Sequence, residues 1–304
     1  MSNPSTHPVA ALGGTPPMVM PTRQRSTALR RLAPSHWLPH AIVLTGALIM
    51  LAPFYFMFVF ATHTNTEILS VPPPLWFGSA LDDNLRELVA ERPHFWRSVG
   101  LSLWIAAAST VLNLFLCSLG GFGFSMYEFP GRDKLFAALM ATMLLPAFVG
   151  MIPFVLMMKE LGWLNTTRAL IVPGACSAFG VFLMRQYIGS AVPRELVEAA
   201  RMDGCSEFGI YWRVVLPLIG PALGTLGLVS FIGSYNNFVG ALLVMSDMEM
   251  FTAPLVLRSL QGTGQTPWGA ISAGSAVTVL PLLVLFILYS RRLIEGLTAG
   301  AVKG

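Results

Sequence analysis

Charged residues are scarce in this sequence. Asp, Glu, Lys and Arg together make up 11% of the 304 residues, whereas hydrophobic residues make up 54%. A soluble domain ordinarily carries about 25% charged residues, so this composition excludes one and indicates a membrane protein. Cysteine is scarce too. Cys117, Cys176 and Cys205 fall in two different apolar stretches and one polar loop, so we expect no disulfide.

Motifs that carry chemistry are missing as well. The sequence has no Gly-rich loop ending in Lys-Ser or Lys-Thr, which excludes ATP hydrolysis by the usual phosphate-binding loop. All five histidines lie in the first third of the chain, and none has a metal-ligand spacing on one helix face. Paired acids, or a nucleophile with its base, are not visible. We therefore expect no catalytic residue, no metal site and no cofactor bound by this chain.

What the sequence does contain is long apolar runs. Six stretches lack any Asp, Glu, Lys or Arg: residues 32–66, 98–127, 135–158, 169–184, 214–246 and 259–290. A bilayer core of about 30 Å takes roughly 20 apolar helical residues, so five of the six are long enough to span it. The fourth is short and contains Pro173, and we accept it as a span because Arg185 and the residues after it can extend the helix to the interface. The sequence predicts an all-α membrane protein with six transmembrane helices.

The basic residues set the expected orientation. With a cytoplasmic N-terminus, thirteen Lys and Arg residues lie on the inside and six on the outside, which follows the positive-inside rule. Both termini are then cytoplasmic. We expect a mobile cytoplasmic tail at 1–34, a six-span domain at 35–292 and a cytoplasmic tail at 293–304. The basic residues are scattered at loop ends, which argues against a nucleic-acid partner and leaves the lipid bilayer.

The loop at 190–217 is polar and far longer than a turn between two spans requires. Pro193 suits a helix start, Gly204 can adopt the left-handed conformation that ends a helix, and Ser206 with Glu207 can start a second helix. We therefore predict two short helices joined by a glycine bend.

Helical spacing places four small or apolar positions of the first short helix on one stripe, opposite Glu198. They are Leu196, Ala199, Ala200 and Asp203. Small side chains let another backbone approach closely, which favours a docking element. The alternative is an amphipathic helix on the membrane surface, with Glu198 and Arg201 as a weak surface pair.

A resemblance to a known family favours the docking interpretation. The run Glu198-Ala199-Ala200-Arg201-Met202-Asp203-Gly204, followed by Ile210 and by Leu216-Pro217, resembles the EAA loop of permease subunits of binding-protein-dependent importers. In that family this loop forms coupling helices seated in a cleft of an ATPase subunit. The resemblance implies a type I ABC importer permease of the cell inner membrane. It also implies a pair of ATP-binding subunits that hold ATP and Mg, a second similar permease and an extracytoplasmic binding protein as partners.

The C-terminal run Gly296–Gly304 is similar to the tail of maltose-type carbohydrate permeases, which implies sugar transport. That family often has a Trp-Asn-aromatic signature early in span five, where this chain has Ser234-Tyr235-Asn236-Asn237-Phe238. The sequence departs from the family at that point.

Polar residues inside spans are few, and they tend to face the bundle interior or an aqueous path. The candidates for a substrate path are Asn113, Tyr235, Asn236 and Asn237. They offer neutral hydrogen-bonding groups and a ring, which suits a neutral, hydroxyl-rich ligand, and the alternative is helix-to-helix bonding. Gly120, Gly121 and Gly123 are expected to let helices approach closely.

An ion-coupled secondary transporter of a small neutral solute is the alternative function. Such a protein normally needs an ionisable residue within the membrane, and the central parts of the six stretches hold none. Because backbone carbonyls can also bind sodium, the alternative stays open at this point.

Overall fold

The computed structural model describes residues 37–262 and 265–301, and every regular element within these ranges is helical. The predicted N-terminal tail at 1–34 lies outside the described residues. The helices are α1 (Trp37–Phe60), α2 (Asn65–Ile68), α3 (Leu81–Glu91), α4 (Phe95–Met126), α5 (Arg132–Thr142), α6 (Met151–Glu160), α7 (Arg168–Ile171), α8 (Ala178–Ala191), α9 (Arg194–Met202), α10 (Glu207–Ile210), α11 (Leu216–Leu218), α12 (Gly220–Tyr235), α13 (Phe238–Val244), α14 (Ala253–Ser259) and α15 (Trp268–Ala301).

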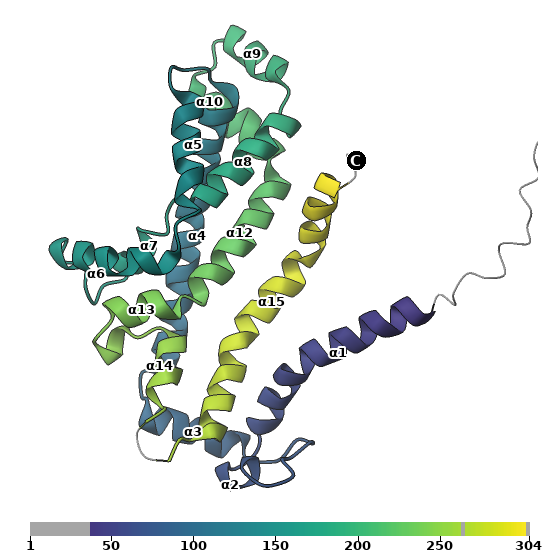
Figure 1. Ribbon diagram of the computed structural model, residues 1–304, viewed down its shortest axis with the longest axis vertical. Helices are drawn as coiled ribbons and strands as arrows, with labels where there is room; N and C mark the ends of the chain where they lie inside the picture. Colours follow the sequence, from purple (N-terminus) through teal and green to yellow (C-terminus); the bar gives the residue numbers. More distant parts are fainter. Residues whose placement is uncertain (1–36, 263–264, 302–304) are drawn as a thin grey trace, which may run out of the picture. The chain divides into compact units, whose positions relative to one another are not determined.

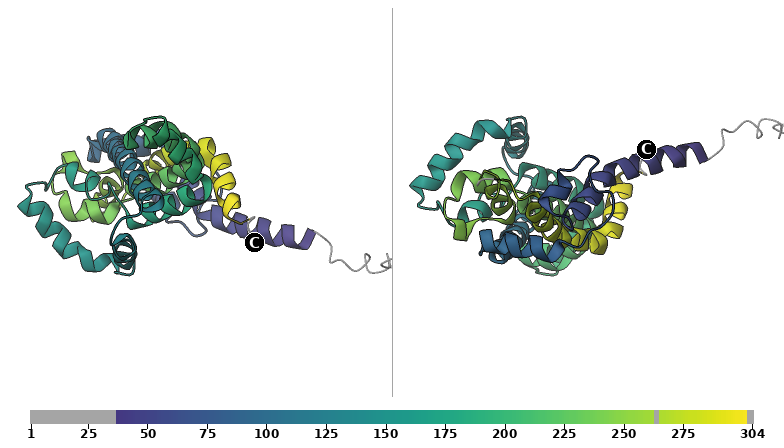
Figure 2. Two further views of the ribbon diagram at one scale, coloured as in Figure 1. Left: turned by 90° about the horizontal axis from the view of Figure 1, so that it is seen from above. Right: turned by 90° about the horizontal axis from the view of Figure 1, so that it is seen from below.

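The chain divides into two units, residues 1–52 and 53–304, and α1 passes from one to the other at Pro53, the proline inside this helix. In the second unit α4 packs along α8 and α12, and α12 packs on α15. Figure 2 shows α6 to one side of the bundle formed by α4, α8 and α12. The three cysteines are free, as expected.

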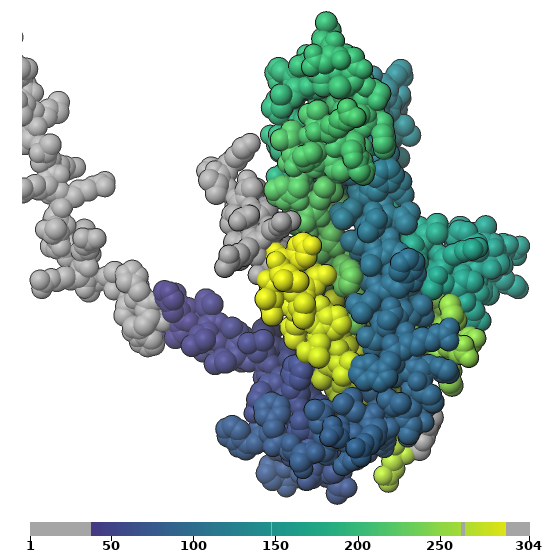
Figure 3. Space-filling view, turned by 180° about the vertical axis from the view of Figure 1, so that it is seen from behind, coloured from purple at the N-terminus to yellow at the C-terminus, as the bar shows by residue number. Residues whose placement is uncertain are grey.

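Helix α4 sets the length of the second unit. Its 32 residues correspond to about 48 Å at 1.5 Å per residue. Helices α9 and α10 lie at one end of this unit, and α2 and α3 lie at the opposite end (Figure 1). In the space-filling view the segment that contains α9 and α10 forms a tip (green, at the top of Figure 3). The two ends are therefore separated by the length of a membrane span.

Three helices are long and apolar enough to cross a membrane within the described residues: Leu38–Phe60, Phe95–Met126 and Trp268–Tyr289. A fourth candidate is the bent pair Glu207–Leu218 and Gly220–Tyr235, whose halves meet at 83°. Helix α15 continues past position 292 to Ala301, so the segment predicted as a C-terminal tail begins as helix.

The predicted third and fourth spans are not single helices, which corrects the expectation of one continuous helix for each. Helix α5 ends at Thr142 and α6 begins at Met151, with Pro146 between them; α7 ends at Ile171, shortly before Pro173. Proline has no N–H to donate and its ring clashes with the preceding turn, which interrupts a helix at both places.

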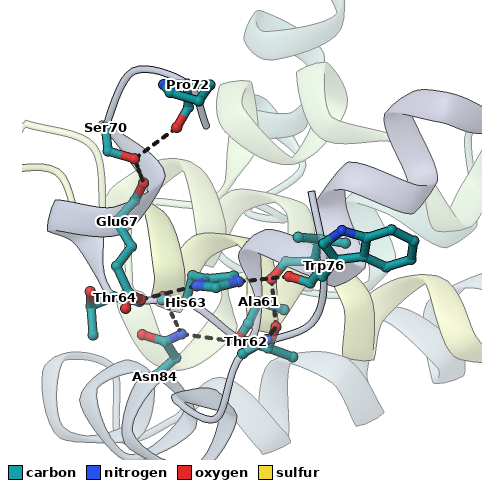
Figure 4. A network of polar contacts seen from close by, with 11 residues as sticks. Ala61, Thr62, His63, Thr64, Glu67, Ser70, Pro72, Trp76 and Asn84 are labelled. Atoms are coloured by element: carbon teal, nitrogen blue, oxygen red, sulfur yellow. Dashed lines mark hydrogen bonds and ion pairs between the residues drawn. The ribbon is translucent and has the colours of Figure 1, made fainter. Parts of the chain in front are cut away.

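The segment after α1 is organised around His63 (Figure 4). Its Nε2 lies 2.8 Å from the Trp76 carbonyl oxygen, and its Nδ1 lies 3.0 Å from a carboxylate oxygen of Glu67. Because a carbonyl and a carboxylate can only accept, this arrangement calls for two N–H donors and favours the imidazolium form of His63. Asn84 on α3 donates to the carbonyls of Ala61 and His63, at 2.8 and 2.9 Å, and joins α3 to the same network.

The His63 network predicts a pH dependence. Hydrogen bonding to the Trp76 carbonyl, helped by Glu67, raises the pKa of His63 above its ordinary value of 6.5. A raised pKa means that the stabilisation is fully present below pH 6.5 and is lost as the pH rises through the folded-state pKa. Amide exchange over residues 69–77, corrected for intrinsic rates, should be faster at about pH 8.5 than at about pH 6. A His63→Gln variant should lose this difference, and an unchanged difference in that variant would assign the pH dependence to another group.

Candidate functional site

The predicted pair of short helices with a glycine bend is present in the loop at 190–217. Helix α9 ends in a Schellman motif: the Gly204 N–H donates to the Arg201 carbonyl and the Cys205 N–H to the Ala200 carbonyl, both at 3.0 Å. Gly204 has φ +80°, the left-handed conformation that this motif requires. Helix α9 begins at Arg194, one residue after the Pro193 start predicted from the sequence.

The second short helix has a side-chain cap. The Ser206 hydroxyl accepts from the Gly209 N–H at 3.2 Å, which fixes the start of α10. Gly204 therefore lies between two capped helix ends. The Ala200 and Arg201 carbonyls at the end of α9 are hydrogen-bonded, and so is the Gly209 N–H in the first turn of α10. The bend is defined by its own hydrogen bonds.

The buried side of α9 differs from the stripe predicted by helical spacing. Val197 and Ala200 are buried in a hydrophobic core that they share with residues of α8 and of the segment after α10. The other members of the predicted stripe, together with Met202, are exposed: Leu196, Ala199, Met202 and Asp203. Met202 is 88% exposed. Helix α9 thus turns one face inward and leaves a second, mostly apolar face without cover. Glu198 is exposed as well.

Arg201 forms an ion pair across the bend, and its partner is Glu207, not Glu198. Its Nε lies 2.7 Å from Glu207 Oε1, and its guanidinium lies 5.3 Å from the centre of the Tyr127 ring. The Tyr127 hydroxyl donates to the same Glu207 carboxylate. The hydrogen bonds from Arg201 and Tyr127 lower the pKa of Glu207, so this carboxylate stays ionised at neutral pH.

This brace of Arg201, Glu207 and Tyr127 links the bend to the loop after α4, and reasoning from the sequence did not find it. Tyr127 is 80 residues from Glu207, so no helical spacing could pair them. The only signal was the acidic residue in the first turn of α10, which was assigned to the helix start. A second contact to the same loop joins Arg194 on α9 to Glu128, at 3.4 Å.

The bend is also connected to the long helices. A π-helical turn, Tyr211–Val215, follows α10 and buries Tyr211, whose hydroxyl lies 2.8 Å from the hydroxyl of Ser118 on α4. Leu216 and Pro217 lie in α11, before the 83° bend to α12. Pro221 explains that bend, because it cannot donate to the carbonyl four residues earlier. The segment after α10 is therefore in contact with α4 and leads directly into α12.

A pocket of about 820 Å³ opens between α4, α6, the segment after α7, α12 and α13. Its polar lining residues are neutral: Ser109, Asn113, Ser177, Ser230, Ser234 and Asn237. Asn113 is buried, and its Nδ2 donates to the Gly174 carbonyl at 3.0 Å, while its Oδ1 has no protein partner. The Ser109 hydroxyl is also buried without a partner. Two residues that line the pocket thus each carry a buried polar atom without a protein partner.

The four predicted path residues separate in the structure. Asn113 and Asn237 both line this pocket, and Asn237 also caps α13 by accepting from the Gly240 N–H at 3.0 Å. Tyr235 is buried elsewhere and donates to the Thr278 carbonyl on α15 at 2.9 Å, which is the helix-to-helix bonding considered as the alternative. Asn236 is exposed and does not line the pocket.

The comparisons with known proteins bear on the whole arrangement. The family model described as the inner membrane component of binding-protein-dependent transport systems matches residues 118–293. This range includes the loop at 190–217 and most of the residues that line the pocket. The chain belongs to this family. It is therefore a permease of the inner membrane.

Several relatives of this permease cover most of its length. It is 36% identical to the arabinooligosaccharides transport system permease protein AraQ of Halalkalibacterium halodurans, over 73% of this chain and 79% of the relative. It is 30% identical to the lactose transport system permease protein LacG of Rhizobium radiobacter, over 91% and 99%. It is 31% identical to the trehalose/maltose permease MalG of Thermococcus litoralis, over 88% and 98%.

A solved structure shares the fold of this permease. One chain of a bacterial ABC transporter involved in the import of the acidic polysaccharide alginate superposes with a TM-score of 0.74, at 23% identity, over 88% of this chain and 98% of that chain. The likeness establishes the type I ABC permease fold.

Proposed function

We propose that this permease is one of two membrane subunits of an ATP-driven importer that translocates a sugar or sugar derivative by alternating access. The observation that carries the proposal is the set of relatives named for sugars, which match most of the chain. The pocket agrees with it in chemistry, because its polar groups are neutral hydroxyls and amides.

The loop at 190–217 suggests which partners this permease binds. The uncovered face of α9, with Leu196, Ala199, Met202 and Asp203, is apolar enough to enter a cleft on an ATP-binding subunit. The brace from Arg201 to Glu207 makes α9 and α10 move together, and the Tyr211 contact carries that movement to α4. A second permease and an extracytoplasmic binding protein complete the proposed assembly, and ATP with Mg belongs to the ATPase pair.

Six spans follow if three of them are discontinuous, of which the fifth consists of α12 and α13. We place α5 with α6 in the third span and α7 with α8 in the fourth. Irregular backbone is tolerated at membrane depth where it is covered by protein or lines a cavity. Phe148 and Gly150 at the first break, and Pro173 and Gly174 at the second, all line the pocket of about 820 Å³, which supports this assignment.

The breaks also support the pocket as the substrate path. A third break, between α12 and α13, contributes Asn237 to the same lining. Breaks in membrane helices often mark a transport site, since they expose backbone and side-chain polar groups at membrane depth. Among the described lining residues none is charged, which favours a neutral sugar over an anionic one.

The orientation we propose puts both termini and α9 in the cytoplasm. The excess of basic residues on that side supports it, and so does the placement of α9 and α2 at opposite ends of the second unit. The extracytoplasmic side then carries α2, α3 and the segment between them.

The experiment is purification of the tagged permease in mild detergent with its co-expressed partners, followed by uptake in proteoliposomes. An ATPase subunit should co-purify, and ATP should drive sugar uptake. A Ser230→Phe variant should lower the uptake rate and leave ATPase recruitment unchanged, because the ring fills the pocket. Ile232→Phe, on the same helix but outside the lining, is the matched control. If no ATPase co-purifies and uptake follows an ion gradient, the secondary-transporter alternative replaces this proposal.

A further inference from the structure

The segment between α2 and α3 exposes apolar side chains without any charge among them. No Asp, Glu, Lys or Arg occurs from Ile68 to Leu81. The exposed apolar side chains are Leu69, Val71, Leu75, Trp76 and Phe77. Val71 is 97% exposed and Trp76 is 79% exposed. An exposed apolar surface of this kind, on a segment that connects two helices, indicates an interaction site.

The segment is held in place by contacts at both sides. The Tyr55 hydroxyl on α1 donates to the Leu75 carbonyl at 2.6 Å, and the rings of Tyr55 and Phe77 lie 6.0 Å apart. His63 donates to the Trp76 carbonyl at 2.8 Å (Figure 4), and the Gly78 N–H donates to the Thr62 hydroxyl at 2.8 Å. The exposed side chains therefore stand on a fixed backbone.

Part of the backbone of this segment is already hydrogen-bonded within the protein. Pro72, Pro73 and Pro74 have no N–H group, so three consecutive donors are missing where they would otherwise have to be solvated. The Leu75 and Trp76 carbonyls accept from Tyr55 and His63. The single hydrogen of the Ser70 hydroxyl is shared between the Glu67 carbonyl, at 2.7 Å, and the Pro72 carbonyl, at 3.0 Å. Burying an unpaired polar group in an apolar medium is costly, and the Leu75 and Trp76 carbonyls are already paired.

The segment lies next to a helix that is long and apolar enough to span the membrane, which indicates that lipid is its binding partner. Its contact with Tyr55 puts it beside the end of α1, an apolar helix long enough to span the membrane. Trp and Tyr are enriched where spans leave the hydrocarbon, because their rings have an apolar body and a polar edge. Here Tyr55 on the span donates to the carbonyl of Leu75, the residue next to Trp76 on the loop.

We propose that residues 69–77 insert into the interface of the extracytoplasmic leaflet and anchor this end of the permease to phospholipid. The absence of charge, the exposed Val71 and Trp76, and the paired carbonyls of Leu75 and Trp76 all fit an occupant made of acyl chains and headgroups. A protein partner would be recognised by polar groups as well, and this surface offers few. The choice of leaflet rests on the proposed orientation; the insertion does not.

The test is fluorescence quenching by lipid. In a Cys176→Ser, Cys205→Ser background that keeps the buried Cys117, the variants Val71→Cys and Trp76→Cys are labelled with an environment-sensitive dye. Asp82→Cys, on the exposed first turn of α3, is the matched control. The labelled importer is placed in nanodiscs of phosphatidylethanolamine and phosphatidylglycerol. A fraction of the lipid carries a nitroxide quencher on its acyl chain, at a position close to the headgroup.

The dye at positions 71 and 76 should be quenched and blue-shifted, whereas the dye at 82 should be neither. Equal, weak quenching at all three positions would overturn the proposal. A blue shift at 71 and 76 without lipid quenching, gained only when the binding protein or the second permease is added, would overturn it too and assign the surface to that protein. Uptake measured on the same samples reports separately on the proposed importer function.

Discussion

Replacing Gly204 with valine should abolish ATP-driven uptake while leaving the permease in the membrane. Gly204 has φ +80°, a conformation in which a side chain with a Cβ is disfavoured by about 1–2 kcal/mol and a β-branched one by more. Valine would force the bend to open, and the Schellman bonds from Gly204 and Cys205 would be lost with it. The face of α9 would then turn away from the direction set by α10.

A graded series at this position separates conformation from packing. No atom lies within 4 Å of a Cβ built on Gly204, so a larger side chain meets no neighbour there. Gly204→Asn should retain most of the uptake, because asparagine tolerates the left-handed conformation, and Gly204→Ala should fall between asparagine and valine. The measurements are sugar uptake and ATP hydrolysis in proteoliposomes. Equal loss in the asparagine and valine variants would refute the conformational explanation.

The bend between α9 and α10 could be predicted because the residues that determine it act on backbone close to them in the sequence. Pro193, Gly204 and Ser206 each act through their own backbone or the next few residues, so their order in the sequence specifies helix, bend and helix. The buried side of α9 could not be predicted in the same way. It depends on where α8 and the π-helical turn place their apolar side chains, and helical spacing alone gives a stripe without saying which part meets the core.

Contacts between distant residues account for the other differences. The carboxylate of Glu207 is shared by Arg201 and Tyr127, and only the packing of α10 against the end of α4 brings Tyr127 there. The polar residues of the spans were found from the sequence, but their assignment required the fold: Tyr235 bonds to α15, whereas Asn113 and Asn237 meet at one pocket. Pro173 was noted in the short fourth stretch, whereas the break near Pro146 was not predicted, and nothing in the sequence shows that the two breaks face the same cavity.

A close approach of α4 and α8 provides the second large prediction, at Gly121 on α4. A Cβ built on Gly121 would lie 2.5 Å from the Met184 Cβ and 2.8 Å from the Arg185 backbone nitrogen, both on α8. Backbone cannot move aside as a flexible side chain can, so Gly121→Ala should destabilise the permease by about 1–3 kcal/mol and Gly121→Val by more.

Gly123, two residues further along the same helix, offers a matched control. A Cβ there would meet nothing within 4 Å, and alanine is a better helix former than glycine, so Gly123→Ala should leave stability unchanged or raise it slightly. The measurement is the fraction that stays monodisperse in detergent after heating. Both α4 and α8 line the pocket, and α4 carries the Ser118 contact to Tyr211, so the Gly121 variants should also lose uptake. If Gly121→Val were as stable as the Gly123→Ala control, α4 and α8 could not be packed as closely as the structure has them.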